Sequence, residues 1–321
     1  MTPDTGALVV SLDFELHWGV RDHEPVDGPY RANLLGARTA IPRLLDLFEE
    51  YGVSATWAVV GFLFAGSRAD LERHRPRVLP RYADRALDPY DEAVGEGEAD
   101  DPLHYAPSLV AAIRERPGQE IGTHSYSHYY CAEPGQGREA FADDLRSAVA
   151  IAGRAGVELR SIVFPRNQVN PAYAGVLVDA GLHCYRGTGP AALAGAGSGA
   201  RGRRLLDAYL GRDARAVPWE SVRQPNGLHD VAASLFLRPW TPRWRRFDRL
   251  RRDRVVRGLR EAASSGQIFH LWWHPHNFGA HPDQNLAFLR EVLEAFAAYR
   301  DRGALRSLSM RGVAGELGAG H

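Results

Sequence analysis

Apolar runs alternate with amphipathic segments along most of the chain. Residues 7–16 (ALVVSLDFEL) are continuously apolar until they end in acidic residues, a pattern typical of a strand that is buried on both faces. Residues 40–52 (AIPRLLDLFEEYG) then repeat apolar positions at helical spacing and stop at a glycine, which favours a helix. Residues 53–64 (VSATWAVVGFLF) form a second apolar run. The start of the sequence therefore predicts a β-α-β unit.

The same alternation continues along the chain. It predicts further strands over residues 120–125, 159–165, 182–187 and 267–274, and helices over residues 107–116, 137–156, 171–181 and 283–303. Strands that alternate with helices in this way form parallel sheets, and this many β/α units suit a barrel better than a small open sheet. We therefore predict an α/β protein built on a (β/α) barrel.

Two segments interrupt the β/α pattern. Residues 66–106 are rich in proline and charge, and we expect them to form an insertion that caps the barrel mouth. Residues 189–203 form a Gly/Ala loop that we expect to be mobile. Neither segment has the character of a linker, so a single domain over residues 1–321 is predicted.

Composition excludes some kinds of chemistry. All 39 strongly basic residues are arginines, which rules out a Schiff-base lysine and a phosphate-loop lysine. The formal net charge is zero, so the molecule as a whole predicts no nucleic-acid partner. Cys131 and Cys184 are expected to be free thiols with structural roles.

The sequence also shows neither a membrane-spanning segment nor a signal-peptide pattern. No segment approaches the ~20 apolar residues of a membrane-spanning helix. Residues 1–6 lack the basic and then apolar pattern of a signal peptide. These features predict a cytoplasmic protein; the sequence leaves its oligomeric state open.

Arginine is concentrated in residues 238–260 (RPWTPRWRRFDRLRRDRVVRGLR). One interpretation is a solvated amphipathic helix with Leu250, Val255 and Leu259 facing inward. The other is a surface that binds the phosphate groups of a lipid-linked or nucleotide-linked substrate. A lipid-linked substrate would bring this surface into peripheral contact with a membrane. The solvated amphipathic helix is the favoured interpretation.

Two carboxylates end the first predicted strand. Asp13 and Glu15 are two residues apart, so strand alternation sends both to the same side at the C-terminal rim. Like charges this close repel unless a cation or a proton separates them. His124 and His128 in GTHSYSH supply the imidazoles that, with either carboxylate, make the three-ligand set of a catalytic zinc. An i, i+4 histidine pair alone is a weak signal, but the companion carboxylates favour a metal site.

A later strand end carries further histidines. In FHLWWHPHNFG, His270 and His274 share one face of the strand, whereas Trp273 lies on the other. We interpret His270 as a hydrogen-bonded core group and His274 as a proton donor at the rim. The strand predicted over residues 159–165 is followed directly by Arg166, whose guanidinium could keep a carboxylate ionised.

These clusters in this order resemble the polysaccharide deacetylase (NodB-homology, carbohydrate esterase family 4) proteins. The resemblance is carried by SLDFE, HSYSH, LWWHPHN and the helix and strand of residues 40–64. It implies a distorted (β/α) barrel of about seven strands. It also implies that Asp13 is the general base, that His274 is the general acid, and that Glu15, His124 and His128 hold a divalent metal.

The resemblance further implies hydrolysis of the N-acetyl group of an amino sugar or glycan precursor, lipid-linked or nucleotide-linked. Zn²⁺ is the expected metal, and Co²⁺, Ni²⁺, Mn²⁺ and Fe²⁺ suit the same ligands. Phe14 separates two acids that are usually adjacent in the family, so the choice between Asp13 and Glu15 as ligand stays open. An allantoinase-like hydrolase of a non-sugar amide and a non-catalytic glycan-binding barrel are the alternatives.

The remaining candidates concern substrate contacts. FPRNQ stands in place of the family's third motif, and residues 217–239 stand in place of its fourth. Arg166 is accordingly expected to partner the base. The predicted substrate-binding residues are Asn167, Gln168, Trp219, Glu220, Trp273, His276 and Asn277.

Overall fold

The computed structural model describes residues 3–188 and 215–318. The predicted Gly/Ala loop at 189–203 lies outside this part of the chain. The described residues form a curled sheet in which every strand pairing is parallel. The strands are β1 (Gly6–Phe14), β2 (Ala55–Val59), β3 (Gln119–Thr123), β4 (Ser161–Val163), β5 (Cys184–Arg186), β6 (His229–Asp230), β7 (Leu235–Phe236), β8 (Ile268–Trp273) and β9 (Leu305–Leu308).

The sheet has the strand order β6-β5-β4-β3-β2-β1-β8-β7, and β9 pairs with β1. This arrangement confirms the predicted α/β fold with a distorted, incompletely closed barrel. The nine described strands exceed the expected seven, because β6 and β7 are only two residues long and carry no periodic signal. The strand predicted over residues 182–187 narrows to β5.

β1 is the centre of the sheet. It pairs with β8 through residues Ala7–Leu12, while its other edge is shared by two strands. β9 pairs with Gly6–Val9 and β2 with Val10–Phe14. β1 therefore has neighbours on both edges from Ala7 to Leu12, and Asp13 and Phe14 at its C-terminal end are paired with β2.

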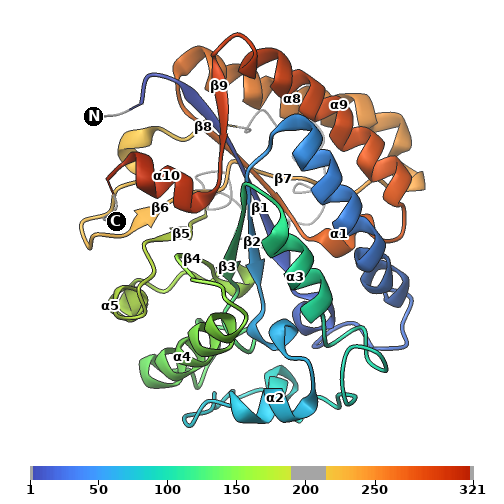
Figure 1. Cartoon of the computed structure of the whole chain (residues 1–321), viewed down its shortest axis with the longest axis vertical. Helices are drawn as coiled ribbons and strands as arrows, with labels where there is room; N and C mark the ends of the chain where they lie inside the picture. Colours follow the sequence, from blue (N-terminus) through green and yellow to red (C-terminus); the bar gives the residue numbers. More distant parts are fainter. Residues whose placement is uncertain (1–2, 189–214, 319–321) are drawn as a thin grey trace.

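Helices cover the outer face of the sheet (Figure 1). The described helices are α1 (Arg31–Tyr51), α2 (Arg68–Arg73), α3 (Pro107–Glu115), α4 (Arg138–Arg154), α5 (Ala174–Asp179), α8 (Asp248–Ser265), α9 (Pro282–Arg300) and α10 (Met310–Glu316). Two of them do not cover the outer face: α2 belongs to the insertion at 66–106, and α10 packs against Ala7 and Val9 at the start of β1. α1, α9 and α8 lie side by side in Figure 1, and α9 contacts both α1 and α8. α1 begins nine residues before the predicted position of 40, and it ends as expected at Gly52, whose φ of 62° suits glycine.

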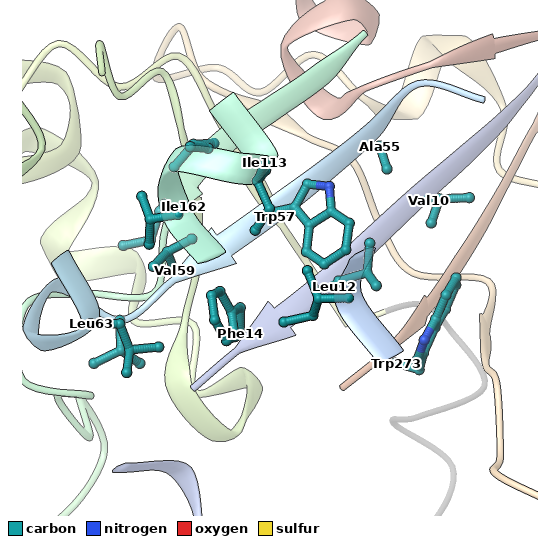
Figure 2. Packing of buried hydrophobic residues seen from close by; sticks show 14 of the residues in the cluster. Val10, Leu12, Phe14, Ala55, Trp57, Val59, Leu63, Ile113, Ile162 and Trp273 are labelled. Carbon is teal, nitrogen blue, oxygen red and sulfur yellow. The ribbon is translucent and has the colours of Figure 1, made fainter. Parts of the chain in front are cut away.

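Alternation along β1 separates the core from the site. Leu8, Val10, Leu12 and Phe14 point to the helices and belong to the main hydrophobic cluster. Figure 2 shows three of these side chains beside Trp57 and Val59 of β2, Ile113 of α3 and Trp273 of β8. The opposite face carries Ala7, Val9, Ser11 and Asp13, which change from apolar to charged toward the end of the strand. The inner face therefore becomes polar only at the C-terminal rim.

The insertion at 66–106 lies against the loops that follow β1, β2 and β3. His17 N–H donates to Leu103 O at 3.2 Å, and Ala106 N–H donates to Leu63 O at 3.2 Å. Tyr130 N–H donates to the hydroxyl of Tyr82 at 2.9 Å. The insertion is thus attached at the rim where the polar side chains gather; that it caps the barrel mouth stays a prediction.

The arginine-rich segment forms a short 3-10 helix, Pro242–Phe247, followed by α8. Val255 and Leu259 are buried as predicted, but Leu250 is 42% exposed, so its predicted inward position is wrong. Arg251 occupies that inner position, with its guanidinium 3.9 Å from the ring centroid of Phe288. The buried residues of α8 begin at Arg251 and recur at spacings of three and four residues, and Leu250 does not belong to this series.

Cys131 and Cys184 are both buried and free, as expected. Among the described helices, none is long and apolar enough to cross a membrane.

Two leucines test this account of the core. Leu12→Ala should lower the free energy of unfolding by about 2–5 kcal/mol, because it opens a cavity at a fully buried position. Leu250→Ala, the matched control, should change it by no more than about 0.5 kcal/mol. Urea denaturation of both variants measures the difference, and equal effects would contradict the assigned burial of these side chains.

Candidate metal centre

Glu15, His124 and His128 converge at the rim of the sheet. Glu15 follows β1 and His124 follows β3, so both lie at the C-terminal ends of strands separated only by β2. Glu15 Oε2 is 3.3 Å from His124 Nε2 and 3.1 Å from His128 Nε2. All three residues are at most 4% exposed. One carboxylate oxygen therefore faces two imidazole nitrogens in a region from which water is largely excluded.

Hydrogen bonding fixes the orientation of the first imidazole. His124 Nδ1–H donates to Val163 O at 2.8 Å, which leaves the lone pair of Nε2 directed toward Glu15. Burial lowers the pKa of His128 to about 4 and outweighs the opposing effect of Glu15. Its imidazole is therefore neutral near pH 7, as a metal ligand must be.

The loop of residues 124–128 is held by a buried carboxylate of α4. Asp144 Oδ1 accepts from Tyr126 N–H at 2.7 Å, and Oδ2 accepts from Ser127 N–H at 3.1 Å and from the Ser127 hydroxyl. Burial raises the pKa of Asp144 to about 6, although these donors oppose the shift. These bonds stabilise positive φ angles of 61° at Ser125 and 57° at His128. The backbone strain is local to the residues that present the imidazoles.

The second carboxylate has a different partner. Arg186, at the end of β5, donates to Asp13 through two bonds, Nη1 to Oδ1 at 2.6 Å and Nη2 to Oδ2 at 2.7 Å. Burial alone would raise the pKa of Asp13, but the guanidinium and the nearby His124 and His274 lower it below its ordinary value. Asp13 is therefore an ionised, buried carboxylate whose two oxygens are both held by one arginine.

A hydrogen-bonded chain behind this pair fixes the arginine. His270 Nδ1–H donates to Val231 O at 2.8 Å, so Nε2 accepts from the Ser11 hydroxyl at 2.8 Å. Ser11 Oγ in turn accepts from Arg186 Nη1 at 3.0 Å. Burial lowers the pKa of His270 to about 3, which keeps it neutral. His270 is thus the hydrogen-bonded core histidine predicted from the sequence.

His274 lies over both carboxylates from the end of β8. Its Nε2 is 3.6 Å from Glu15 Oε1 and 3.8 Å from Asp13 Oδ2. Its Nδ1–H donates to Asn277 Oδ1 at 3.3 Å, and its side chain is 23% exposed. The ring of His276 stacks beside it with centroids 5.0 Å apart. His274 is therefore the histidine of this group that both reaches the carboxylates and contacts solvent.

Arg166 does not partner Asp13, contrary to the prediction. It pairs with Asp22 and with Glu133, and its guanidinium lies 4.0 Å from the ring centroid of Tyr130. The backbone at Arg166 has a φ of 55°, which turns the side chain away from the direction expected at a strand end. Arg186 pairs with Asp13 instead.

The neighbouring amides are divided between two positions. Asn167 Oδ1 accepts from Arg186 Nη2 at 2.9 Å, so Asn167 lies beside the carboxylate pair. Gln168 accepts from Ala132 N–H at 3.0 Å and donates to Glu133 at 2.9 Å, which fastens the loop after β3. Asn277 donates to the hydroxyl of Tyr30 at 3.1 Å. Of these amides, Asn167 and Asn277 contact the residues of the site.

Three predicted substrate contacts lie elsewhere. Trp219 is 2% exposed, packs in the cluster of Ala7 and Val9 at the start of β1, and donates to Gly266 O at 2.9 Å. Glu220, beside it, is exposed at the same end of the sheet. Trp273 is fully buried in the main core. The predictions for Trp219 and Glu220 are wrong because their segment lies at the end of the sheet opposite the rim. The prediction for Trp273 is wrong because its side chain is on the face of β8 that packs against the helices.

The sequence analysis overlooked Arg186, Trp272 and Asp144. Arg186 lies near the end of the predicted strand 182–187, the same kind of position that Asp13 and His274 occupy. Trp272 shares the face of His270, and its ring lies 4.1 Å from the Arg186 guanidinium. Asp144 is in the middle of a helix, where a buried acid has no periodic signature.

The donors present fit a divalent metal. Two imidazoles and one carboxylate within 4.8 Å of one another are a ligand set for zinc. The outward hydrogen bond of His124 Nδ1 is the orientation that metal-bound imidazoles show. Asp13 keeps its own arginine partner, so Glu15 is the carboxylate free to face an ion.

Comparison with known proteins places this geometry in context. A family model described as polysaccharide deacetylase matches residues 27–185. A search of curated protein sequences gave no significant match. A candidate polysaccharide deacetylase from Mycobacterium smegmatis is similar in structure, with a TM-score of 0.62 and 16% identity over 99% of this chain and 94% of that chain.

Similarity of fold extends to larger carbohydrate-active proteins. A GH57-type branching enzyme from Pyrococcus horikoshii aligns with a TM-score of 0.53 and 14% identity over 97% of this chain and 70% of its own. A 4-alpha-glucanotransferase from Thermococcus litoralis aligns with a TM-score of 0.53 and 11% identity over 98% of this chain and 40% of its own. At these identities the structural likeness concerns the fold alone.

Replacement of the buried Arg186 should lower the free energy of unfolding far more than replacement of the exposed Arg166. Arg186→Gln leaves Asp13 buried without a counter-charge and should lower the free energy of unfolding by about 3–5 kcal/mol near pH 7. Arg166→Gln, the control, should lower it by no more than about 1 kcal/mol.

The cost of Arg186→Gln should depend on pH. Arg186 lowers the folded-state pKa of Asp13, so the pair contributes stability above the unfolded pKa of about 3.9 that is lost as pH falls. In Arg186→Gln, burial without the guanidinium would raise the pKa of Asp13, so the difference from the unmodified protein should shrink as pH falls and Asp13 becomes protonated in the variant. Urea denaturation at several pH values measures it, and a gap that does not change with pH would argue against the ion pair.

Proposed function

The chain belongs to the polysaccharide deacetylase family, and on that basis we propose that it is a metal-dependent N-deacetylase. Its substrate would be an N-acetylated amino sugar or glycan precursor, and its products acetate and a free amine. One observation carries the proposal: the Glu15, His124 and His128 donors lie beside a second carboxylate, Asp13, that is neutralised separately by Arg186. A binding protein has no need of two adjacent buried carboxylates with such different partners.

We assign Glu15 as the metal ligand and Asp13 as the general base. Glu15 Oε2 is the carboxylate oxygen shared by both imidazoles. Asp13 is held by Arg186, which orients it and keeps it ionised and ready to accept a proton. This is the assignment that we propose for the choice between Asp13 and Glu15 that the sequence left open.

Zn²⁺ is the ion we propose, and Co²⁺, Ni²⁺, Mn²⁺ or Fe²⁺ would suit the same donors. When bound, such an ion polarises the acyl carbonyl and acidifies a water molecule. Asp13 would take a proton from the attacking water as the oxygen of that water bonds to the carbonyl carbon. His274 gives a proton to the departing nitrogen as the carbon–nitrogen bond breaks, which its distance from both carboxylates and its partial exposure allow.

The surroundings of His274 suit a sugar ring. Trp272 and Phe236 present their rings 5.7 Å and 6.0 Å from the centroid of His274. Asn277 orients the imidazole, and His276 packs behind it. Aromatic faces next to a hydrogen-bonding histidine are a typical environment for a carbohydrate, so we propose that the acetamido group enters beside β8.

A direct assay tests the proposal against its alternatives. Metal-depleted protein is supplied with Zn²⁺ or Co²⁺ and incubated with N-acetylated sugars, nucleotide-linked sugars and a cyclic ureide. Release of acetate supports the deacetylase, whereas ring opening of the ureide without acetate would support the allantoinase-like alternative. Binding of glycan without turnover of any substrate would support the non-catalytic barrel.

The metal ligands are tested by metal content. His124→Ala should lose one equivalent of zinc relative to the unmodified protein, because it removes one of three donors. His23→Ala is the matched control, since the side chain of His23 is 57% exposed. Elemental analysis after gel filtration measures both variants, and an unchanged content in His124→Ala would remove the proposed centre.

The two proton-transfer residues should separate binding from chemistry. Asp13→Asn should retain its zinc but lose measurable turnover, because the amide cannot accept the proton. His274→Ala should lower kcat by roughly 10²–10⁴-fold with the metal content unchanged. Steady-state kinetics together with metal analysis checks both; a normal kcat in either variant would reassign that role.

A further inference from the structure

A second cluster of metal-ligating side chains lies outside the site described above. His17 belongs to the 3-10 helix Leu16–Gly19 that follows β1, whereas Glu92 and His104 belong to the insertion at 66–106. His17 Nδ1 and His104 Nε2 are 3.0 Å apart. Glu92 Oε1 is 3.5 Å from the first nitrogen and 3.6 Å from the second. The three donor atoms therefore form a compact triangle.

The outer hydrogen bonds leave the inner atoms as lone pairs. His17 Nε2–H donates to Glu24 O at 3.0 Å, so Nδ1 carries no proton in the neutral ring. His104 Nδ1 faces the carboxylate of Asp101 at 2.8 Å and 2.9 Å, so the proton lies on that side. Two nitrogen lone pairs and a carboxylate oxygen then face one another. Such an arrangement repels unless a cation or a further proton occupies its centre.

The dimensions favour a metal ion at that centre. Donors at zinc–ligand distances of 2.0–2.1 Å lie about 3.3 Å apart in a tetrahedral site. The three separations here average close to that value, and the carboxylate–histidine pairing of Asp101 with His104 is the support that metal-bound imidazoles receive.

Burial is compatible with a bound ion. His17 and His104 are each 1% exposed, so an unpaired charge there would be costly. The side chain of Glu92 is 22% exposed, which gives an ion and a water ligand a path from solvent. We propose that His17, Glu92 and His104 form a second divalent-cation site, with zinc as the ion that these donors suit best.

This site would have a mechanical role distinct from the proposed catalysis. His17 is two residues from Glu15, and the other two ligands come from the insertion. A bound ion would therefore fasten the insertion to the segment that carries the carboxylate of the first centre. Trp18 strengthens the same junction, since its Nε1–H donates to His104 O at 2.9 Å.

The test isolates the second site by removing the first. His124→Ala/His128→Ala protein should still bind one equivalent of zinc after gel filtration in zinc-containing buffer. Adding His104→Gln should reduce this to none, whereas adding His23→Gln should leave one equivalent. Added zinc should also raise the Tm of the double variant but not that of the variant that also lacks His104.

A single isosteric change covers the case in which the multiple variants do not fold. Glu92→Gln in the otherwise unmodified protein should lower the zinc content from two equivalents to one and leave the circular dichroism spectrum unchanged. The proposal is overturned if the protein holds at most one equivalent of zinc and Glu92→Gln leaves that content unchanged. A proton on His104 would then account for the cluster. Burial lowers the pKa of His104, but the carboxylates of Asp101 and Glu92 outweigh this effect and raise it. Failure of the deacetylase assay would leave this result unaffected, because it reads metal content and Tm.

Discussion

The buried ion pair of Asp13 and Arg186 is the interaction on which the rest of the site depends. Two carboxylates lie two residues apart at the end of the central strand, and both are almost fully buried. Arg186 neutralises one of them through two hydrogen bonds, which leaves Glu15 to face the two imidazoles. Without that division the two buried acids would repel each other.

The fold supplies this division by alternation and by strained turns. Odd-numbered residues of β1 face inward, so Ser11 and Asp13 lie in line beneath the rim, and Ser11 connects Arg186 to His270 on β8. All the described non-glycine residues with positive φ belong to the loops after β1, β3 and β4: Leu16, Ser125, His128, Arg166 and Asn167. The scaffold stores its backbone strain where the functional side chains are aimed.

The sequence predicted much of this arrangement, and its errors have physical causes. Periodicity located most of the long strands and helices, and the rule that strand ends share a rim brought Glu15, His124 and His274 together. Arg166 was placed wrongly because a positive φ reverses its direction, which no periodic pattern reveals. Trp219 was misplaced because a short segment without a clear strand returns to the other end of the sheet. The cluster of His17, Glu92 and His104 escaped notice because two of its members lie in an irregular insertion.

The turn after β1 joins the two metal-ligating clusters. Leu16, at a φ of 46°, separates Glu15 from His17, and this bend directs the first side chain toward β3 and the second toward the insertion. Any movement of the insertion away from the rim would be transmitted along residues 15–17 to the carboxylate of Glu15. An ion held by His17, Glu92 and His104 would resist such movement. The insertion would then help to keep Glu15 in place.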